Sequence, residues 1–337
     1  MKNTKNNQSY DLAGLYTLSL RMVIGWTYFS AFWRRLILEN KLTPDENGYI
    51  GEKFNHFLPN ALGIKPIIEY LVTHPDSLQR SMMTFTIIEA VVGLLIILGF
   101  FTRLMSIGIF SLALGILLGS GWLGTTCVDE WQIGVLGVAG GFVLFLTGSS
   151  TYSIDHYFIE KSKSFTYSTW FRWLGSGPLP VVNVKSFVLA GSLIIFGLTL
   201  YTNQYFHGGV WGTLHNKSVQ PKIEISNISH EKSFLKFQLY RTEGADVYGS
   251  FLIGIHILDK NGNVLKELSH TDLSKFAQEN IENHYVAKIR PGKHSLVIPL
   301  GAKADISINI GDIIQKSEIH TLKLIDISGI EWVKTLR

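Results

Sequence analysis

The sequence is poor in cysteine, in charge and in recognisable cofactor motifs. A single cysteine, Cys127, excludes an internal disulfide and a metal cluster held by several thiolates. Only 17% of the residues are charged and the net charge is +4, too small and too scattered to indicate nucleic-acid binding. The chain has no P-loop, GxGxxG, haem-attachment motif or serine nucleophile elbow, and its histidines lack metal-ligand spacing. We therefore expect no metal, haem or flavin, and no nucleic-acid partner.

Long apolar runs, in contrast, are frequent. Five of them cover residues 12–33, 82–101, 104–122, 131–147 and 187–205. Each is close to the ~20 residues that an α-helix needs to cross a bilayer. The polar N-terminus leads into the first run without a small-residue cleavage site, so we expect a retained helix and no cleaved signal peptide. A further apolar stretch, 61–72, is too short to span and predicts an interfacial or re-entrant segment.

Glycines recur at GxxxG spacing within the third and fourth runs. The pairs are Gly115 with Gly119 and Gly137 with Gly141. Small residues at this spacing let membrane helices approach closely. We therefore expect these glycines to serve helix packing and to have no catalytic meaning.

After Pro221 the hydrophobic period changes from that of helices to that of strands. Short runs of alternating, often β-branched residues, from KIEISNI to TLKLIDI, are separated by turn signals at 260–263 and at Pro291-Gly292. The expected fold is a membrane α-helical bundle of about five transmembrane helices followed by a C-terminal, all-β, sandwich-like domain. The predicted division is a four-helix membrane domain over 1–184 and a second region over 185–337. That second region comprises a transmembrane helix at 187–205, a connector at 206–221 and a β domain at 222–337.

Two ionisable residues lie inside the apolar runs. Arg21 is near the middle of the first run and Glu89 is in the first half of the second. An unpaired charge in hydrocarbon is costly, so such residues are functional candidates by default. We predict that Arg21 and Glu89 form an intramembrane charge pair. A purely structural pair and a role in proton or anion handling both stay open.

The sequence around Cys127, and the connector, concentrate polar groups at the ends of apolar runs. Cys127 lies in GWLGTTCVDEW, where Asp129 and Glu130 would disfavour a thiolate unless a cation is supplied from elsewhere. The connector YFHGGVWGTLHNKSVQP contains two histidines, an asparagine and a lysine. Cys127 can be a small buried residue or a reactive thiol, and the connector can be a plain linker or a source of donors.

These segments together resemble a known enzyme family. FSAFWRR in the first run, IIEAVVGLLIILGFFTR in the second, and GSGWLGTTCVDEW are similar to the DoxD subunit of thiosulfate:quinone oxidoreductase, within the wider DoxX-type group. The region from the fifth run onward, with GGVWGTLHNKSVQPKIEISN, resembles the DoxA subunit. The resemblance covers nearly the whole chain, as a natural fusion of two subunits.

The resemblance implies oxidation of thiosulfate to tetrathionate, with membrane quinone as the diffusible electron acceptor. It does not indicate which residues react. We predict Cys127 as the catalytic residue, through a covalent adduct. Cations and donors near the membrane surface are the predicted ligands of the thiosulfate dianion: Arg34, Arg35, Arg80, His207, His215, Asn216 and Lys217. Aromatic residues near the ends of the helices are the predicted quinone contacts: Trp26, Phe29, Trp33 and Trp122.

Two other classes of function stay open from the sequence. One is a non-enzymatic DoxX-type membrane scaffold that presents a β domain to a redox partner, and the other is a sulfur-anion transporter. We expect a multi-pass protein of the cytoplasmic membrane, in contact with the lipid bilayer, and leave a homo-oligomer open. The positive-inside count is nearly tied, so the predicted placement of the β domain on the periplasmic or extracellular side depends mainly on the resemblance.

Overall fold

A computed structural model describes residues 2–44, 46, 48–124, 129–231, 233–246, 249–311 and 319–336. The chain forms two compact units, and neither is continuous in sequence. The helical unit consists of Met1–Tyr49, Gln79–Gly121 and Val128–His215. The β unit consists of Ile50–Leu78, Trp122–Cys127 and Asn216–Arg337. The β unit therefore contains two segments that precede the predicted β domain in sequence.

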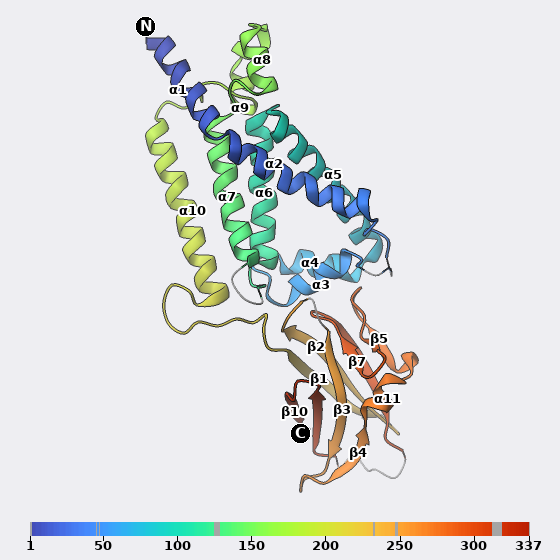
Figure 1. Ribbon diagram of the computed structural model, residues 1–337. Coiled ribbons are helices and arrows are strands. Elements are labelled where there is room, and N and C mark those ends of the chain that lie inside the picture. The colour runs from blue at the N-terminus through green and yellow to red at the C-terminus, as the bar shows by residue number, and fades with distance from the viewer. Residues whose placement is uncertain are drawn as a thin grey trace. The chain divides into compact units, whose positions relative to one another are not determined.

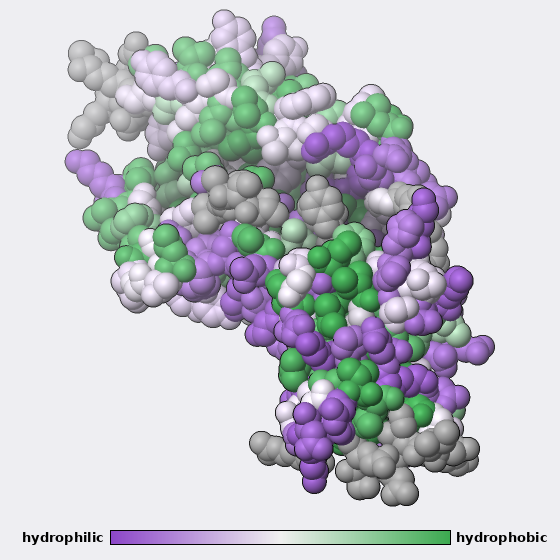
Figure 2. Space-filling view, turned by 60° about the horizontal axis from the view of Figure 1, so that its bottom comes forward, coloured by the Kyte–Doolittle hydropathy of each residue, from purple (hydrophilic) through white to green (hydrophobic). Residues whose placement is uncertain are grey.

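The helical unit is built from long apolar helices and short connecting ones (Figure 1). Its elements are α1 (Lys2–Tyr16), α2 (Leu18–Phe32), the π-helix η1 (Trp33–Leu38), α5 (Pro75–Leu98), α6 (Thr102–Ser120), α7 (Asp129–Thr147), α8 (Ile154–Glu160), η3 (Ser164–Tyr167), α9 (Thr169–Leu174) and α10 (Val184–His207). Within the described part of the chain, α5, α6, α7 and α10 are long and apolar enough to cross a membrane. Figure 2 shows green, hydrophobic side chains on the surface of this part. The helices thus form a membrane bundle.

The first predicted span, residues 12–33, is not a single regular helix in the structure. Residues 12–33 fall in two helices of 15 residues each, α1 and α2, which are separated at Thr17. The Thr17 hydroxyl donates to the carbonyl of Ala13 at 3.1 Å, and the Thr17 amide donates to the same carbonyl at 3.2 Å. The amide of Arg21 donates to the carbonyl of Thr17 at 2.9 Å, so helical hydrogen bonds continue across the point that divides α1 from α2. Taken singly, neither helix reaches the length of a full span, so among the described residues four helices qualify as candidate spans where about five spans were expected.

Close helix packing depends on glycines. A Cβ on Gly141 would lie 2.9 Å from the backbone nitrogen of Phe110, and one on Gly137 would lie 2.7 Å from the Cβ of Ala113. The predicted packing role of this pair is confirmed, because these glycines let α7 approach α6. A Cβ on Gly115 would meet nothing within 4 Å, so the prediction is wrong for that glycine. Gly93 of α5 makes a similar close approach to α2, where its Cβ would lie 2.5 Å from the nitrogen of Phe29.

The β unit contains a sandwich of two antiparallel sheets, as predicted (Figure 1). The strands are β1 (Lys222–Glu231), β2 (Phe234–Glu243), β3 (Ser250–Leu258), β4 (Val264–Leu268), β5 (Ile281–Asn283), β6 (Arg290–Pro291), β7 (Leu296–Ile298), β8 (Lys303–Asn309), β9 (Thr321–Asp326) and β10 (Glu331–Thr335). One sheet has the order β1-β2-β8-β5, and the other has β10-β9-β3-β7-β6 with β4 beside β3. Alternate residues such as Leu235, Phe237 and Leu239 face a shared core with residues of β3, β8 and β9.

Short helices complete the β unit. α11 (His270–Ser274) begins after Ser269, which with Asp272 forms a capping box, and the 3₁₀ turn η4 spans Gln278–Asn280. α3 (Gly51–Phe57), the 3₁₀ turn η2 (Leu58–Asn60) and α4 (Lys65–Thr73) come from the segment before α5. The stretch predicted as interfacial therefore contains α4, whose buried face packs on Tyr285 of the sandwich while Ile67 stays 62% exposed.

Candidate functional site

The connector meets the loop that precedes Cys127. Asn216 donates from Nδ2 to the carbonyl oxygen of Gly124 at 2.7 Å, and the amide of Gly124 donates to Oγ of Ser218 at 3.0 Å. The Ser218 hydroxyl in turn donates to the Gly124 carbonyl. Asn216 and Ser218 thus hold this loop at Gly124, three residues before Cys127. Cys127 itself lies outside the described residues. Its predicted catalytic role stays a prediction.

Lys217 is directed to a different element of the β unit. Its Nζ donates to Oδ1 of Asn60 at 3.0 Å, and Asn60 also donates from Nδ2 to the carbonyl of Thr242 at 3.0 Å. Trp122, at the start of the same loop as Gly124, donates from Nε1 to the carbonyl of Phe57 at 3.2 Å. Two predicted ligands, Asn216 and Lys217, are thus brought to the end of η2 and to the loop before Cys127.

Sequence reasoning missed Asn60 and Ser218. Asn60 ends the short η2 turn in LPN, and Ser218 follows the predicted ligand Lys217. Neither residue belongs to a pattern that predicts chemistry, and both act through tertiary hydrogen bonds that no local signal announces.

The two predicted histidines lie in the helical unit. Nε2 of His207 lies 2.9 Å from the carbonyl oxygen of Gly121, and its ring meets Trp131 edge to face. The amide of His215 donates to the carbonyl of His207 at 3.0 Å, which closes the turn after α10. His207 is buried and His215 is exposed. Both histidines therefore have local structural contacts, and their predicted role toward thiosulfate stays a prediction.

The predicted pairing of Arg21 with Glu89 is wrong. Glu89, only 4% exposed, has its Oε2 2.5 Å from Nη1 of Arg35, which also donates to Oγ1 of Thr86 at 3.3 Å. The π-helix η1 carries Arg35 to this position, since its wider turn changes the direction of the side chains that follow α2. Arg35 was predicted to hold thiosulfate, but in the structure its charge is matched by Glu89.

Arg21 has a different environment. Its Nη2 donates to the carbonyl of Tyr152 at 2.5 Å. The side chain lies in the wall of a largely apolar hollow of about 560 Å³, together with residues of α2, α5 and α8. Arg34 and Arg80 are exposed on η1 and α5, and they stay predicted ligands of the anion.

The FTR turn, which was quoted for the family resemblance, has a structural explanation. Thr102 donates from its amide and from its hydroxyl to Oδ2 of Asp155, at 3.0 and 2.9 Å. Arg103 is fully buried and donates to the carbonyls of Phe145, Arg172 and Gly177. These contacts join the start of α6 to the end of α7 and to the segments that follow it. The motif thus holds one end of the helical unit together.

Three of the predicted quinone contacts form an aromatic ladder on α2 and η1. The ring centroids of Trp26 and Phe29 are 6.0 Å apart, and those of Phe29 and Trp33 are 6.1 Å apart. Trp26 and Trp33 are 56% and 41% exposed, so this face is open to lipid in a membrane. Trp122 is only 1% exposed and bonded to Phe57, so its indole offers no surface to a quinone from the bilayer.

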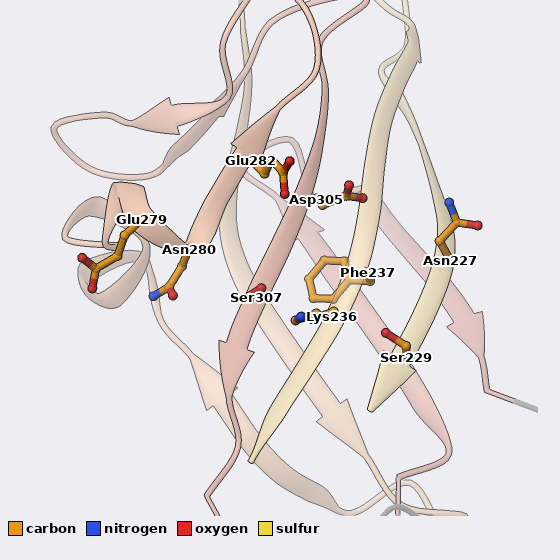
Figure 3. A pocket seen from close by; sticks show the side chains of 9 residues that line it. All are labelled: Asn227, Ser229, Lys236, Phe237, Glu279, Asn280, Glu282, Asp305 and Ser307. Carbon is orange, nitrogen blue, oxygen red and sulfur yellow. The ribbon is translucent and has the colours of Figure 1, made fainter. Parts of the chain in front are cut away.

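A polar groove on the β1-β2-β8-β5 sheet is a further site candidate (Figure 3). It has a volume of about 370 Å³, and Figure 3 shows Lys236 and Ser307 toward its middle, with Glu282 and Asp305 above them. Glu279 adds a third carboxylate, while the Lys236 amine lies 2.6 Å from Glu231. This groove is unfavourable for a dianion such as thiosulfate because carboxylates outnumber its cation. Among the described residues, no group of histidine, cysteine and carboxylate side chains is placed to hold a metal ion.

Comparison with known proteins shows that the chain matches two protein families. Residues 16–196 match the family described as TQO small subunit DoxD, and residues 206–335 match the family described as TQO small subunit DoxA. TQO denotes thiosulfate:quinone oxidoreductase. No solved structure matches the chain. The predicted division at residue 184 stays a prediction; the first match ends at residue 196 and the second begins at residue 206, both within α10. The DoxD match covers more than half of the chain, so the chain belongs to the DoxD family, with a DoxA region fused to it in the same polypeptide.

Proposed function

We propose that this protein oxidises two thiosulfates to tetrathionate and passes the two electrons to a membrane quinone, which takes up two protons from water. The observation that carries the proposal is that one chain matches both TQO small subunit families, over 16–196 and 206–335. Neither family description names a scaffold or an anion transporter. The four apolar helices support access to a bilayer-soluble acceptor.

The thiosulfate site is proposed where the connector meets the loop before Cys127. Asn216 and Ser218 hold that loop at Gly124, and Lys217 lies next to them in sequence with its amine on Asn60. A lysine and amide donors suit the sulfonate oxygens of thiosulfate, and a nearby cation favours the thiolate form of a cysteine. Asn216 and Lys217 would therefore orient the anion for reaction with Cys127.

The proposed chemistry proceeds in two steps. In the first, the S–H bond of Cys127 breaks and a bond forms between the cysteine sulfur and the sulfane sulfur of one thiosulfate. The two electrons released reduce the quinone, which leaves as quinol after taking one proton from the thiol and one from water. In the second, the sulfane sulfur of another thiosulfate attacks the sulfane sulfur of this adduct. The cysteine sulfur leaves and regains a proton, and tetrathionate is released. Splitting the reaction in this way avoids a single step that requires two dianions and a quinone at once.

The quinone is proposed to lie on the aromatic ladder of Trp26, Phe29 and Trp33. These rings are partly exposed on a helix of the membrane bundle and can stack on a planar quinone ring. The β domain is proposed to lie outside the cytoplasm, in keeping with a substrate anion that is met there.

The test is a turnover assay with purified protein, thiosulfate and a soluble quinone analogue, followed by quinol absorbance and tetrathionate analysis. We expect one tetrathionate for each quinol. Cys127→Ala should abolish turnover, and mass spectrometry of the wild type treated with thiosulfate and quinone should find an adduct on the Cys127 peptide. Normal turnover in the alanine variant would exclude the covalent route, and absence of both products in the wild type would exclude the proposed reaction.

A further inference from the structure

We infer that residues 50–78 form a docking surface for the β-sandwich, so that a DoxA-type domain binds the DoxD-type half without needing the covalent connector. The inference concerns assembly and holds whether or not the proposed reaction is correct. It begins from the composition of the β unit: residues 50–78 fall within the DoxD match, and residues 216–337 comprise nearly all of the DoxA match. The contact surface between residues 50–78 and residues 216–337, called the joint below, therefore lies inside one compact unit.

The most buried polar contact of this joint is made by Asn55 of α3. Its Nδ2 donates to the carbonyl of Gly301 at 3.1 Å, and its Oδ1 accepts from the amide of Ala287 at 3.1 Å. Asn55 is fully buried, so its side-chain amide depends on the backbone of Gly301 and Ala287 for these two hydrogen bonds. A Cβ on Gly301 would lie 1.7 Å from the carbonyl oxygen of Asn55, so the two backbones can approach this closely only because position 301 is glycine.

An apolar cluster surrounds this contact. Leu58, Ile68 and Val72 of residues 50–78 are 1–3% exposed and pack with Tyr285 of the sandwich. The Tyr285 hydroxyl donates to Oε1 of Glu69 at 2.9 Å, which fixes the direction of the ring. Apolar side chains covered in this way stabilise the joint through the hydrophobic effect.

Residues 50–78 could not form a stable structure alone. α3 has seven residues and α4 has nine, and helices this short are not stable in water without tertiary packing. Their apolar faces are covered by the sandwich, so the segment is specified as a partner of a β domain. The chemistry of the expected partner is therefore a β-sandwich that offers a glycine at the Gly301 position and a tyrosine at the Tyr285 position.

The covalent connector is built differently. Between α10 and Asn216, Trp211 and Leu214 are 68% and 75% exposed, and a Cβ on Gly212 would meet nothing within 4 Å. An exposed segment of this kind accepts insertions and proteolytic cleavage. The chain can therefore be cut at Gly212 without removing a contact of the docking surface.

The experiment introduces a protease site between Gly212 and Thr213 of the full-length protein in membrane vesicles. After cleavage, the fragment from Thr213 onward lacks all four candidate spans, so it can stay with the membrane only through non-covalent contact. We expect most of it to sediment with the vesicles. Release of the wild-type fragment on cleavage would overturn the inference, and so would equal binding of the purified fragment to protein-free vesicles of the same lipids.

Matched variants locate the contact. Ile68→Glu places a charge in the buried cluster, whereas Ile67→Glu makes the same change at a neighbouring residue that is 62% exposed. We expect at least tenfold more release for Ile68→Glu and no change for Ile67→Glu. Asn55→Ala should also increase release, while Lys65→Ala, whose amine bonds Pro59 within the same segment, should not. Protease resistance of the released fragment verifies that it is folded, and equal retention of all four variants would show that the docking surface lies elsewhere.

Discussion

Among the described residues, each unit contains a buried arginine that bonds three backbone carbonyl oxygens, and the two arginines connect different kinds of segment. Arg103 of the helical unit donates to carbonyls that lie 42, 69 and 74 residues away. Arg241 of the β unit donates to the carbonyls of Glu243, Ala245 and Ile298, of which two are within four residues. The first arginine joins separate segments, and the second mainly orders its own turn.

The difference follows from what holds each unit together. The β unit has a large core in which both sheets bury residues such as Phe237 and Leu324. The main buried cluster of the helical unit is smaller, and many of its apolar residues, such as Ile194 of α10, are exposed because lipid would cover them. In lipid there is little hydrophobic drive between helices. Hydrogen-bonded charges therefore have to fix how the segments meet, whereas in the β unit the core does so.

The largest expected effect comes from replacing Arg103. Arg103→Met would remove three hydrogen bonds from a charged donor, at roughly 1.5–3 kcal/mol for each bond, and would loosen the segments after α7 from α6. We expect loss of folded protein, measured as a monodisperse peak in detergent. Arg241→Met should lower the melting temperature of the β unit and leave it folded, because its core persists. Hydrogen exchange resolved by peptide would distinguish the two units, and an Arg241 variant that is the more damaged would reverse the comparison.

The next effect concerns the buried ion pair of the helical unit. Arg35→Gln or Glu89→Gln leaves one charge buried without its partner, which costs about 3–5 kcal/mol. The double variant should be more stable than either single one, because no uncompensated charge remains. Thermal stability in detergent across the four proteins gives the coupling. If the double variant loses as much as the two single variants combined, the pair is not an isolated structural unit.

The sequence was sufficient for the elements that have a strong, local signal. The apolar runs 82–101, 104–122, 131–147 and 187–205 correspond to the four candidate spans found among the described residues, and alternation after Pro221 predicted the sandwich. These predictions succeed because a membrane span or a strand is specified by its own residues.

The partners of buried charges could not be predicted in the same way. The sequence shows that Arg21 and Glu89 lie in apolar runs, but it does not show which helix faces which. The π-helix η1, which brings Arg35 to Glu89, has no recognisable sequence pattern. Residues 50–78 were missed as a docking surface for a related reason. Their apolar residues are too few to indicate a partner, and the partner begins more than 130 residues later.

A smaller effect is expected from His56 of α3 as the pH falls. Burial, assisted by the charges of Lys53 and Arg241 and opposed by Asp246, lowers the pKa of His56 from 6.5 to about 4. Between these two values the unfolded chain binds a proton that the native β unit does not. The β unit should therefore lose stability as pH falls from 6.5 to 4, by up to roughly 3 kcal/mol.

The measurement is the melting temperature of the β unit at several pH values. His56→Gln should flatten the dependence within this window, whereas the exposed His294→Gln should leave it as in the wild type. An unchanged pH dependence in His56→Gln would assign the loss to another group.

The smallest expected effect is that of the ion pair between Lys53 and Asp246, and it completes the comparison with Arg35 and Glu89. The Lys53 amine lies 2.6 Å from Oδ2 of Asp246, but the two side chains are 40% and 17% exposed. Burial opposes ionisation of Asp246, yet the hydrogen bond and charge of Lys53 outweigh it and keep its pKa below the ordinary 3.8. At this exposure water and salt screen the attraction, so Lys53→Ala should cost only about 0.2–1 kcal/mol at neutral pH. A double-mutant cycle with Asp246→Ala at low and high salt measures the coupling, which should shrink as salt is added.

The Arg35–Glu89 coupling should not respond to salt in this way, because those side chains are 16% and 5% exposed. Equal coupling free energies with equal salt dependence in the two pairs would mean that burial in the helical unit does not strengthen the attraction between Arg35 and Glu89.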